Sequence, residues 1–315
     1  MICMDHVRIA EAIAPASTAN LGCLFDLAAM AVDAWTDKVI VKVEKGREVK
    51  VEGEGIPSGK ENTAYHAAVA VLEKYGDPPV GLNIKVVKGV PVGIGLGSSG
   101  ATAAAAAAAV DLALGGKLTP DDLVWAAGQG EAAVAGAPHY DNVAASVLGG
   151  LAIILSRQPL KVVKMDPPEL AILFLIPVKA PEGKKTRKAR EILPKLVELD
   201  AMVEAMSAIA EFLVSLSRND AAGLGRAVSR GGVVEKARGE IIPGYWELKE
   251  KALKLGALGC NISGAGPSIL ILVKKGGENE IEKALLETAA RYGYRVAKAK
   301  PCPWGALSRR RILEA

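Results

Sequence analysis

The residues best suited to chemistry form a glycine-rich stretch, PVGIGLGSSG at 91–100, which runs directly into an alanine run at 101–109. Gly93, Gly95 and Gly97 allow positive φ and let a ligand approach backbone N–H groups that a Cβ would shield. Alanine favours helix, so the stretch predicts a loop leading into a helix, with Ser98 or Ser99 as its N-cap. Because the first N–H groups of a helix lack internal partners and lie at the positive end of its dipole, this arrangement predicts a phosphate site.

Two other phosphate-binding patterns do not fit this stretch. The P-loop pattern requires a lysine directly after the loop, and none is present. A dinucleotide fold requires an acidic residue after a second strand, whereas Asp111 belongs to the same predicted helix. The remaining alternative is a plain glycine turn before a buried helix.

Further polar and charged residues occur in four separate segments. Asn20 and Asp26 follow the first predicted strand, where such side chains also close loops by themselves. Glu131 lies near the end of a predicted helix, and His139 follows shortly after it. Arg190 and Arg238 each offer the planar donor fork that binds carboxylates. Alone, each of these residues is also compatible with a capping, core or surface role.

Three motifs together resemble those of the GHMP kinases, and within them the homoserine kinase family. The glycine stretch is similar to the second motif of the superfamily, PxGxGLGSSA, with Gly100 where alanine is usual. APASTANLGCLFD at 14–26 resembles the first motif, PASTANLGPGFD, with Cys23 and Leu24 replacing Pro and Gly. NISGAGPS at 261–268 resembles the third motif.

Three further segments carry the resemblance to the homoserine kinases in particular. APHYDNVAAS at 137–146 resembles GHPDNVAP, which we expect to form a turn. KKTRKAREILP at 184–194 resembles STxxARxxLP, and ARGEIIPGYWE at 237–247 resembles EPYRxPLIPGF. The resemblance extends from about residue 7 to residue 271, in the expected order.

The resemblance implies a kinase that transfers the γ-phosphoryl group of ATP to the side-chain hydroxyl of L-homoserine, giving O-phospho-L-homoserine in threonine biosynthesis. ATP and Mg²⁺ are the implied cofactors, and Mg²⁺ needs few protein ligands because it prefers hard oxygens and keeps most of its waters. The implied catalytic residues are Asn20, Asp26, Ser99 and Glu131, with Ser99 and Glu131 as metal ligands. The implied substrate-binding residues are Asn20, Asp26, His139, Asp141, Asn142, Thr186, Arg190 and Arg238. The implied ATP-binding residues are Asn62, Lys88, Pro91, Gly93, Gly95, Leu96, Gly97, Ser98, Ser99, Gly100, Ala101, Gly264, Ala265 and Gly266.

The elements that must position these residues mix helices and strands. Hydrophobic periodicity predicts strands at 7–14, 38–43, 82–87, 171–178, 268–273 and 294–298. It predicts helices at 62–75, 101–114, 120–135, 200–217, 245–255 and 280–292, the third with Thr119 as N-cap before Pro120. We therefore expect an α+β fold of two domains, an N-terminal GHMP ATP-binding domain (1–160) and a C-terminal GHMP domain (161–315). The resemblance implies that the first is ribosomal protein S5 domain 2-like and the second ferredoxin-like.

Composition excludes several other classes of protein. Half of the 315 residues are apolar, the net charge is +4 with both signs interspersed, and 4% are aromatic, so we expect no nucleic-acid partner. The charge-free run at 90–110 is mostly Gly, Ala and Ser, which argues against a membrane span, and the first residues lack the apolar core of a signal peptide. The four cysteines are scattered, which argues against a zinc site or a disulfide scaffold and favours the cytoplasm. Arg309 to Arg311 are expected to form a solvated tail.

Two kinds of alternative remain open at this stage. Archaeal shikimate kinase and mevalonate kinase share the phosphate loops, and shikimate also carries a carboxylate, but Asn20, Asp26 and the PHYDN segment favour homoserine. A non-catalytic ATP-binding regulator of the same fold would be expected to lose Glu131 or Ser99, and both are present. A homodimer is compatible with the sequence.

Overall fold

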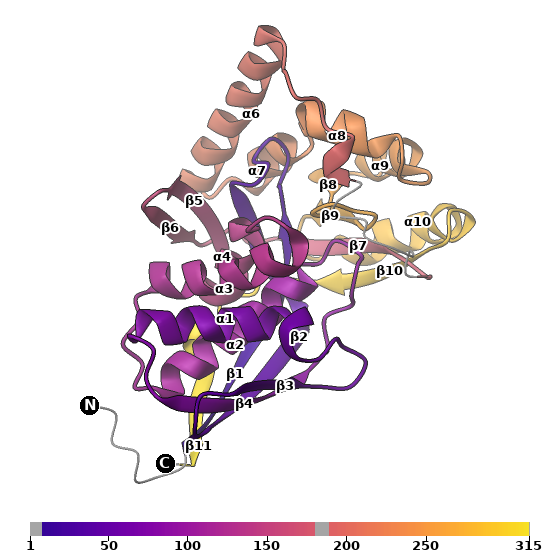
Figure 1. Cartoon of the computed structure of the whole chain (residues 1–315). Helices are drawn as coiled ribbons and strands as arrows, with labels where there is room; N and C mark the ends of the chain where they lie inside the picture. The colour runs from indigo at the N-terminus through magenta and orange to yellow at the C-terminus, as the bar shows by residue number, and fades with distance from the viewer. Residues whose placement is uncertain (1–7, 180–188, 315) are drawn as a thin grey trace.

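The computed structural model describes residues 8–179 and 189–314, which form two β-sheets with associated helices (Figure 1). The first sheet has the order β11-β1-β2-β4-β3, and β2 also pairs with β5, which pairs with β6. Its strands are β1 (Ile9–Ala19), β2 (Ala28–Lys45), β3 (Val49–Glu52), β4 (Val80–Val87), β5 (Leu151–Arg157), β6 (Leu160–Met165) and β11 (Arg310–Glu314). The second sheet is antiparallel with the order β10-β7-β9-β8, from β7 (Ala171–Pro177), β8 (Gly259–Ile262), β9 (Ile269–Val273) and β10 (Tyr294–Ala299).

The helices fall into two groups. Those with the first sheet are α1 (Thr63–Lys74), α2 (Ser98–Ala113), α3 (Pro120–Ala135) and α4 (Tyr140–Leu148), with the short turns η1 (Gly59–Glu61) and η2 (Ala306–Ser308). The others are α6 (Leu199–Ser217), α7 (Ala221–Val228), α8 (Gly232–Gly239), α9 (Tyr245–Lys254) and α10 (Glu278–Arg291). Among the described residues, no helix combines the length and apolarity that a membrane crossing requires.

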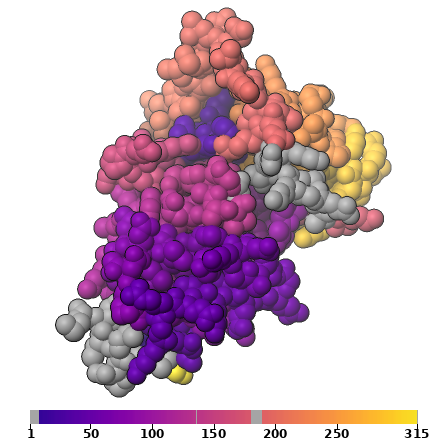
Figure 2. Space-filling model, in the orientation of Figure 1, coloured from indigo at the N-terminus to yellow at the C-terminus, as the bar shows by residue number. Residues whose placement is uncertain are grey.

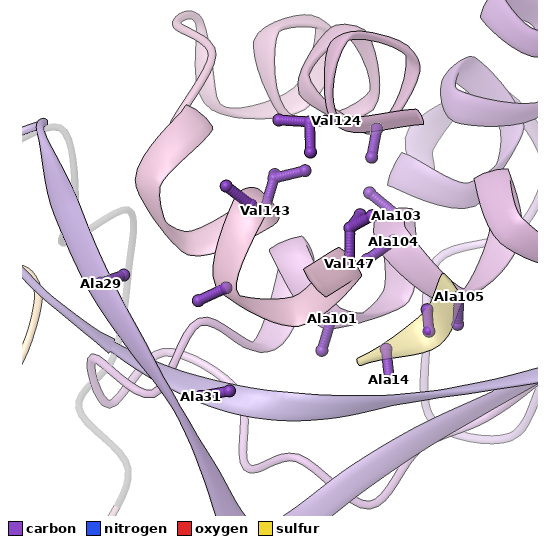
Figure 3. Close-up of a cluster of buried hydrophobic side chains, with 14 of the residues drawn as sticks. Ala14, Ala29, Ala31, Ala101, Ala103, Ala104, Ala105, Val124, Val143 and Val147 are labelled. Carbon is purple, nitrogen blue, oxygen red and sulfur yellow. The ribbon is translucent and has the colours of Figure 1, made fainter. Parts of the chain in front are cut away.

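Helix α2 is buried almost all round, between the sheet and helices α1, α3 and α4. Figure 3 shows Ala101 and Ala105 of α2 in one cluster with Ala14 of β1 and with Val143 and Val147 of α4. Alanine suits this position because it combines high helix propensity with a side chain small enough for close approach on every side. The packing therefore holds the first turn of α2, and the glycine loop before it, in one place.

Strand β7 lies between two hydrophobic cores. Leu173 and Leu175 belong to the core that includes Leu248 of α9 and Leu285 of α10. Phe174, on the opposite face, belongs to the core of the first sheet, where its ring centroid lies 6.0 Å from that of Trp35. The alternation of side chains along one strand thus joins the two sheets. The domain division after residue 160 stays a prediction.

The expected strands and helices are all present, with ends that differ by several residues, so the mixed α and β architecture is confirmed. The PHYDN segment is not a turn, because His139 is the N-cap of α4 and the following residues form its first helical turn. The expectation of a solvated tail at Arg309 to Arg311 was wrong for Arg310, whereas Arg309 and Arg311 are exposed, Arg311 on strand β11. Arg310 pairs with the buried Asp111 of α2, and Arg311 Nε lies 2.7 Å from Glu11 Oε1, because β11 pairs with β1.

Candidate active site

A cavity of about 720 Å³ lies where the β1–β2 loop, the glycine loop, the end of α3 and the start of α4 meet residues from the second half of the chain. Most of the residues expected at the site line it: Asn20, Asp26, Gly93, Gly95, Leu96, Gly97, Ser98, Ser99, Gly100, Glu131, His139, Asp141, Asn142, Arg190, Arg238, Gly264, Ala265 and Gly266. Asn62, Lys88, Pro91 and Ala101 lie outside the lining. Thr186 lies outside the described residues.

The glycine loop approaches two other loops so closely that side chains would not fit. A Cβ on Gly95, where φ is +83°, would lie 2.3 Å from the carbonyl oxygen of Ser263. A Cβ on Gly97 would lie 2.1 Å from Ser17 Oγ. At Gly100, by contrast, the nearest atom to an added Cβ is Asn142 Cβ at 3.4 Å, which is an ordinary contact. The glycine at this position, where the family usually has alanine, therefore changes little.

The N-cap of α2 is Gly97, in the left-handed conformation, and not one of the serines as expected. The hydroxyl of Ser98 instead turns below the loop, where it donates to the carbonyl oxygen of Val90 at 2.9 Å. Ser99, one residue further on, is exposed and lines the cavity. The first N–H groups of α2 thus lie at the cavity without a side-chain cap, as an anion site requires.

The side chain of Lys88 lies below the glycine loop and forms hydrogen bonds there. Its ammonium donates to Asp37 Oδ2, to Ser98 Oγ at 2.7 Å and to Thr102 Oγ1 at 3.0 Å. Asp37 Oδ1 accepts hydrogen bonds of 3.0 Å from the backbone N–H groups of Gly89 and Val90. Burial lowers the pKa of Lys88, against the opposing effect of Asp37. This network fixes the strand end, the loop and the first turn of α2 relative to one another.

Glu131 and Ser99 both line the cavity and carry oxygens of the kind that Mg²⁺ prefers. Glu131 is buried, and its Oε2 lies 2.9 Å from His139 Nδ1. Burial alone would lower the pKa of His139, but the hydrogen bond and the negative charge of Glu131 raise it. The other carboxylate oxygen, Oε1, is buried without a hydrogen-bond partner, which is the state expected of an oxygen that serves another ligand. The described residues form no cluster of three or more His, Cys, Asp or Glu side chains suited to a metal, so nucleotide and water oxygens would complete the coordination.

Opposite charges meet at the other end of the cavity. Arg190 Nη2 donates to both oxygens of Asp26, at 3.0 and 3.1 Å. Arg238 is buried and donates from Nη1 to the carbonyl oxygen of Gly264 at 2.9 Å and from Nε to that of Ala189 at 3.1 Å. Both guanidinium groups lie over the ring of Phe25, and burial lowers the pKa of Arg238 to about 10. One carboxylate and two guanidinium groups therefore surround an aromatic ring.

The first turn of α4 contributes a buried carboxyl group and an amide. Asp141 Oδ1 accepts from the backbone N–H of Asn142 at 2.8 Å, and Asn142 Oδ1 accepts from Ser17 Oγ at 3.0 Å. Burial raises the pKa of Asp141 to about 6, and the negative charge of Asp26 contributes in the same direction. The pKa of Asp141 thus lies close to neutral pH.

Side-chain hydrogen bonds tie the three loops together. Thr18 Oγ1 and Ser263 Oγ are 2.9 Å apart, and Ser263 Oγ donates to the carbonyl oxygen of Gly95 at 2.7 Å. Asn20 donates to the carbonyl oxygen of Gly264 at 2.8 Å and accepts from the backbone N–H of Asp26 at 3.2 Å. Both ends of the Asn20 amide are engaged in this way, which holds Asp26 in its left-handed conformation at the cavity.

The Asn62 amide is likewise engaged, since it caps α1 by accepting from Ala64 N at 2.9 Å and donates to the carbonyl oxygen of Pro57 at 2.8 Å. The sequence reasoning missed Asp37 and Phe25. Phe25 lies inside a recognised motif and could have been found there, whereas nothing near Asp37 in the sequence marks it.

Two family descriptions match the chain. Residues 62–150 match GHMP kinases N terminal domain, and residues 202–291 match GHMP kinases C terminal. The homoserine kinase of Pyrobaculum aerophilum is 38% identical over 299 residues, which is 94% of this chain and 99% of that protein. The homoserine kinase of Sulfurisphaera tokodaii is 38% identical over 297 residues, which is 91% of this chain and 96% of that protein.

Solved structures show the same arrangement of elements. The crystal structure of homoserine kinase from Cytophaga hutchinsonii has a TM-score of 0.85 and 32% sequence identity, and the match covers 99% of each chain. The mevalonate kinase of Methanococcus jannaschii has a TM-score of 0.69 at 17% identity, over 95% of this chain and 99% of that one. At that identity the second likeness concerns the fold alone.

Proposed function

Since this chain belongs to the homoserine kinase family of the GHMP kinases, with their two-domain fold, we propose that its cavity transfers the γ-phosphoryl group of ATP to the side-chain hydroxyl of L-homoserine. The product is O-phospho-L-homoserine, used in threonine biosynthesis. The choice of L-homoserine as substrate rests on the carboxylate of Asp26, which lies beside the guanidinium groups of Arg190 and Arg238.

These three side chains match the two charges of an α-amino acid. The ammonium group of the substrate would take the place of Arg190 against Asp26, and its carboxylate would receive the forks of Arg190 and Arg238. Shikimate and mevalonate carry a carboxylate but no ammonium group, so either would leave the Asp26 charge without a new cation. The geometry therefore favours homoserine over both alternatives.

The opposite end of the cavity suits the phosphates of ATP. The backbone N–H groups of the loop at 93–100 and the first turn of α2 would bind the phosphate oxygens, and the Gly264–Gly266 turn would close over them. Mg²⁺, held by Glu131 and Ser99, would neutralise charge on the phosphates. The transition state of phosphoryl transfer is loose, so the main contribution of these residues is alignment and charge stabilisation.

No side chain has to be ionised for the transfer if the γ-phosphate itself accepts the hydroxyl proton. His139, Asp141 and Asn142 then orient the substrate, and Asn20 holds Asp26 in position. A non-catalytic regulator is disfavoured because Glu131 and Ser99 are both present at the cavity. We also propose that the protein works in the cytoplasm on small molecules alone, without a nucleic-acid or membrane partner, and that it acts as a homodimer.

The test measures ADP release from Mg-ATP with L-homoserine, 4-hydroxybutyrate, shikimate, mevalonate and homoserine lactone. 4-Hydroxybutyrate is the matched control, because it keeps the hydroxyl and the carboxylate of homoserine but lacks the ammonium group. A charged hydrogen bond contributes about 1.5–3 kcal/mol, so we expect kcat/KM to be roughly 10-fold to 150-fold higher for homoserine, and Asp26→Asn to reduce that ratio. Turnover of shikimate or mevalonate above that of homoserine would refute the proposal.

A further inference from the structure

Arg157 contacts the substrate end of the cavity from outside. It is the last residue of β5, and its Nη2 donates to the backbone carbonyl oxygen of Asp26 at 3.1 Å. The same nitrogen lies 3.7 Å from Asp26 Oδ2. Arg157 itself lies outside the lining of the cavity, and half of its side chain is exposed. The sequence motifs described above do not include this residue.

Sheet pairing brings Arg157 to this point. The N–H of Ile154 donates to the carbonyl oxygen of Leu27 at 2.8 Å, and the guanidinium of Arg157 takes the neighbouring carbonyl oxygen, that of Asp26. Between them β5 has a bulge at Leu155, where its register against β6 shifts. A bulge changes the direction of the side chains that follow it. The β1–β2 loop lies beside the β5–β6 hairpin in Figure 1, and indigo atoms of this part of the chain are visible at the same place in Figure 2.

Side chains hold both peptide groups of Asp26. Its N–H donates to Asn20 Oδ1 at 3.2 Å, and its carbonyl oxygen accepts from Arg157. The φ of Asp26 is +57°, a conformation that residues other than glycine keep only where the surrounding structure imposes it. Asn20 fixes one of the two peptide groups, so Arg157 supplies the second constraint on the direction of the carboxylate.

The two arginines beside Asp26 contact different parts of it. Arg190 binds the carboxylate oxygens, where the ammonium group of the substrate would take its place, whereas Arg157 binds the backbone and can stay. We propose that Arg157 is a positioning residue, which holds the Asp26 carboxylate in place while Arg190 leaves it and the ammonium group arrives. This inference rests on the proposed binding of an α-amino acid.

The positive charge of Arg157 by itself would act in the opposite direction. A cation 3.7 Å from Asp26 Oδ2 competes with an ammonium group for the same carboxylate, so removal of the charge alone would strengthen the binding of homoserine. Because half of the Arg157 side chain is exposed, water and salt weaken this competition. We therefore expect the loss of the hydrogen bond to outweigh the loss of the charge.

The test compares Arg157→Met with the wild type in ADP release from Mg-ATP, with L-homoserine and with 4-hydroxybutyrate, which lacks the ammonium group. Methionine keeps a long side chain but donates no hydrogen bond. We expect kcat/KM for homoserine to fall roughly 3-fold to 10-fold, and kcat/KM for 4-hydroxybutyrate and the KM for ATP to stay within about twofold of the wild type. Arg295→Met, at an exposed position on β10, is the matched control and should leave the values for both substrates unchanged.

A double variant tests whether Arg157 acts through Asp26. In an Asp26→Asn background, Arg157→Met should change the ratio of kcat/KM for the two substrates by less than about twofold, because the carboxylate that it positions is absent. Three results would overturn the proposal: an unchanged or higher kcat/KM for homoserine in Arg157→Met, an equal fall for both substrates, or the same fall in the Asp26→Asn background.

Hydrogen exchange in the ligand-free protein provides a measurement that does not depend on the substrate. Arg157→Met should speed exchange of the backbone N–H of Asp26, because the loop loses one of its two constraints, whereas Arg295→Met should not. A wild type that does not phosphorylate homoserine would refute the proposed function, and the positioning role would then stand or fall on the exchange rates. Unchanged exchange in Arg157→Met would refute that role whatever the substrate is.

Discussion

Asp141 offers a direct test of the electrostatics of the cavity, through the variant Asp141→Asn. The side chain is buried, and its pKa is raised from 3.8 to about 6, first by burial and then by the charge of Asp26. A raised carboxyl pKa means that the folded protein favours the protonated form. The ionised form therefore destabilises the fold at neutral pH, and an amide of the same shape removes this cost.

The size of the effect follows from the shift in pKa. A difference of about 2 units at 1.36 kcal/mol each predicts that Asp141→Asn is more stable by on the order of 3 kcal/mol above about pH 7. The stability that the wild-type carboxyl contributes is fully present below 3.8 and is lost as the pH rises through about 6. The advantage of the variant must therefore shrink as the pH is lowered from about 6 towards 3.8, and vanish below that value.

The assay is urea unfolding at a series of pH values, with Asp166→Asn on an exposed loop as the control that should change little at any of them. An Asp141→Asn variant that is no more stable than the wild type at alkaline pH would refute the reasoning, and so would a gain that does not depend on pH. The same variant informs on the chemistry, because a substrate-orienting residue should leave measurable turnover. A loss of kcat of about 10³-fold or more, together with loss of the acidic limb of the pH profile, would instead identify Asp141 as a base.

Three further predictions concern the phosphate and substrate ends of the cavity. Glu131→Gln should lower kcat much more than it raises the KM for ATP, because a neutral amide is a poor Mg²⁺ ligand while the glycine loop still binds phosphate. A kcat within about threefold of the wild type would contradict this prediction. Arg190→Lys and Arg238→Lys should raise the KM for homoserine well above any change in the KM for ATP, since lysine lacks the planar fork, and the opposite pattern would exclude the assignment. Gly95→Ala should abolish ATP binding in calorimetry, because its Cβ would lie 2.3 Å from a backbone oxygen. Gly100→Ala is the control and should bind ATP normally. Equal affinities of the two variants for ATP would show that the loop rearranges freely.

The sequence predicted the parts of the fold whose signals are local. Thr119, Pro120 and Asp122 form the N-terminal cap of α3 as expected, and the side chain of Asp122 completes a capping box. The strand at 49–52 and the helix at 140–148 were missed because both are short and lie beside loops whose composition suggests turns. The role of Arg310 was missed because its partner lies far away along the chain, which no local pattern reports.

The candidate site, too, was predicted only where its sequence signals are local. The motifs identified the three loops that line the cavity, since glycine spacing and polar residues mark them in the sequence. They did not reveal that Lys88 lies beneath the glycine loop with Asp37, or that both ends of the Asn20 amide are engaged in holding other loops. Those roles depend on which strands are neighbours, and only the folded chain establishes that.

The pairing of β11 with β1 has a consequence for how the protein is made. Asp111 is fully buried in α2, and its cationic partner is Arg310, 199 residues later in the chain. A ribosome that adds about 5–20 residues each second reaches that arginine roughly 10–40 s after the aspartate. During that interval the emerging first sheet lacks an edge strand and its central helix carries a carboxylate without a counter-charge. The first half of the chain therefore reaches its final stability only after Arg310 has been added and β11 has paired with β1.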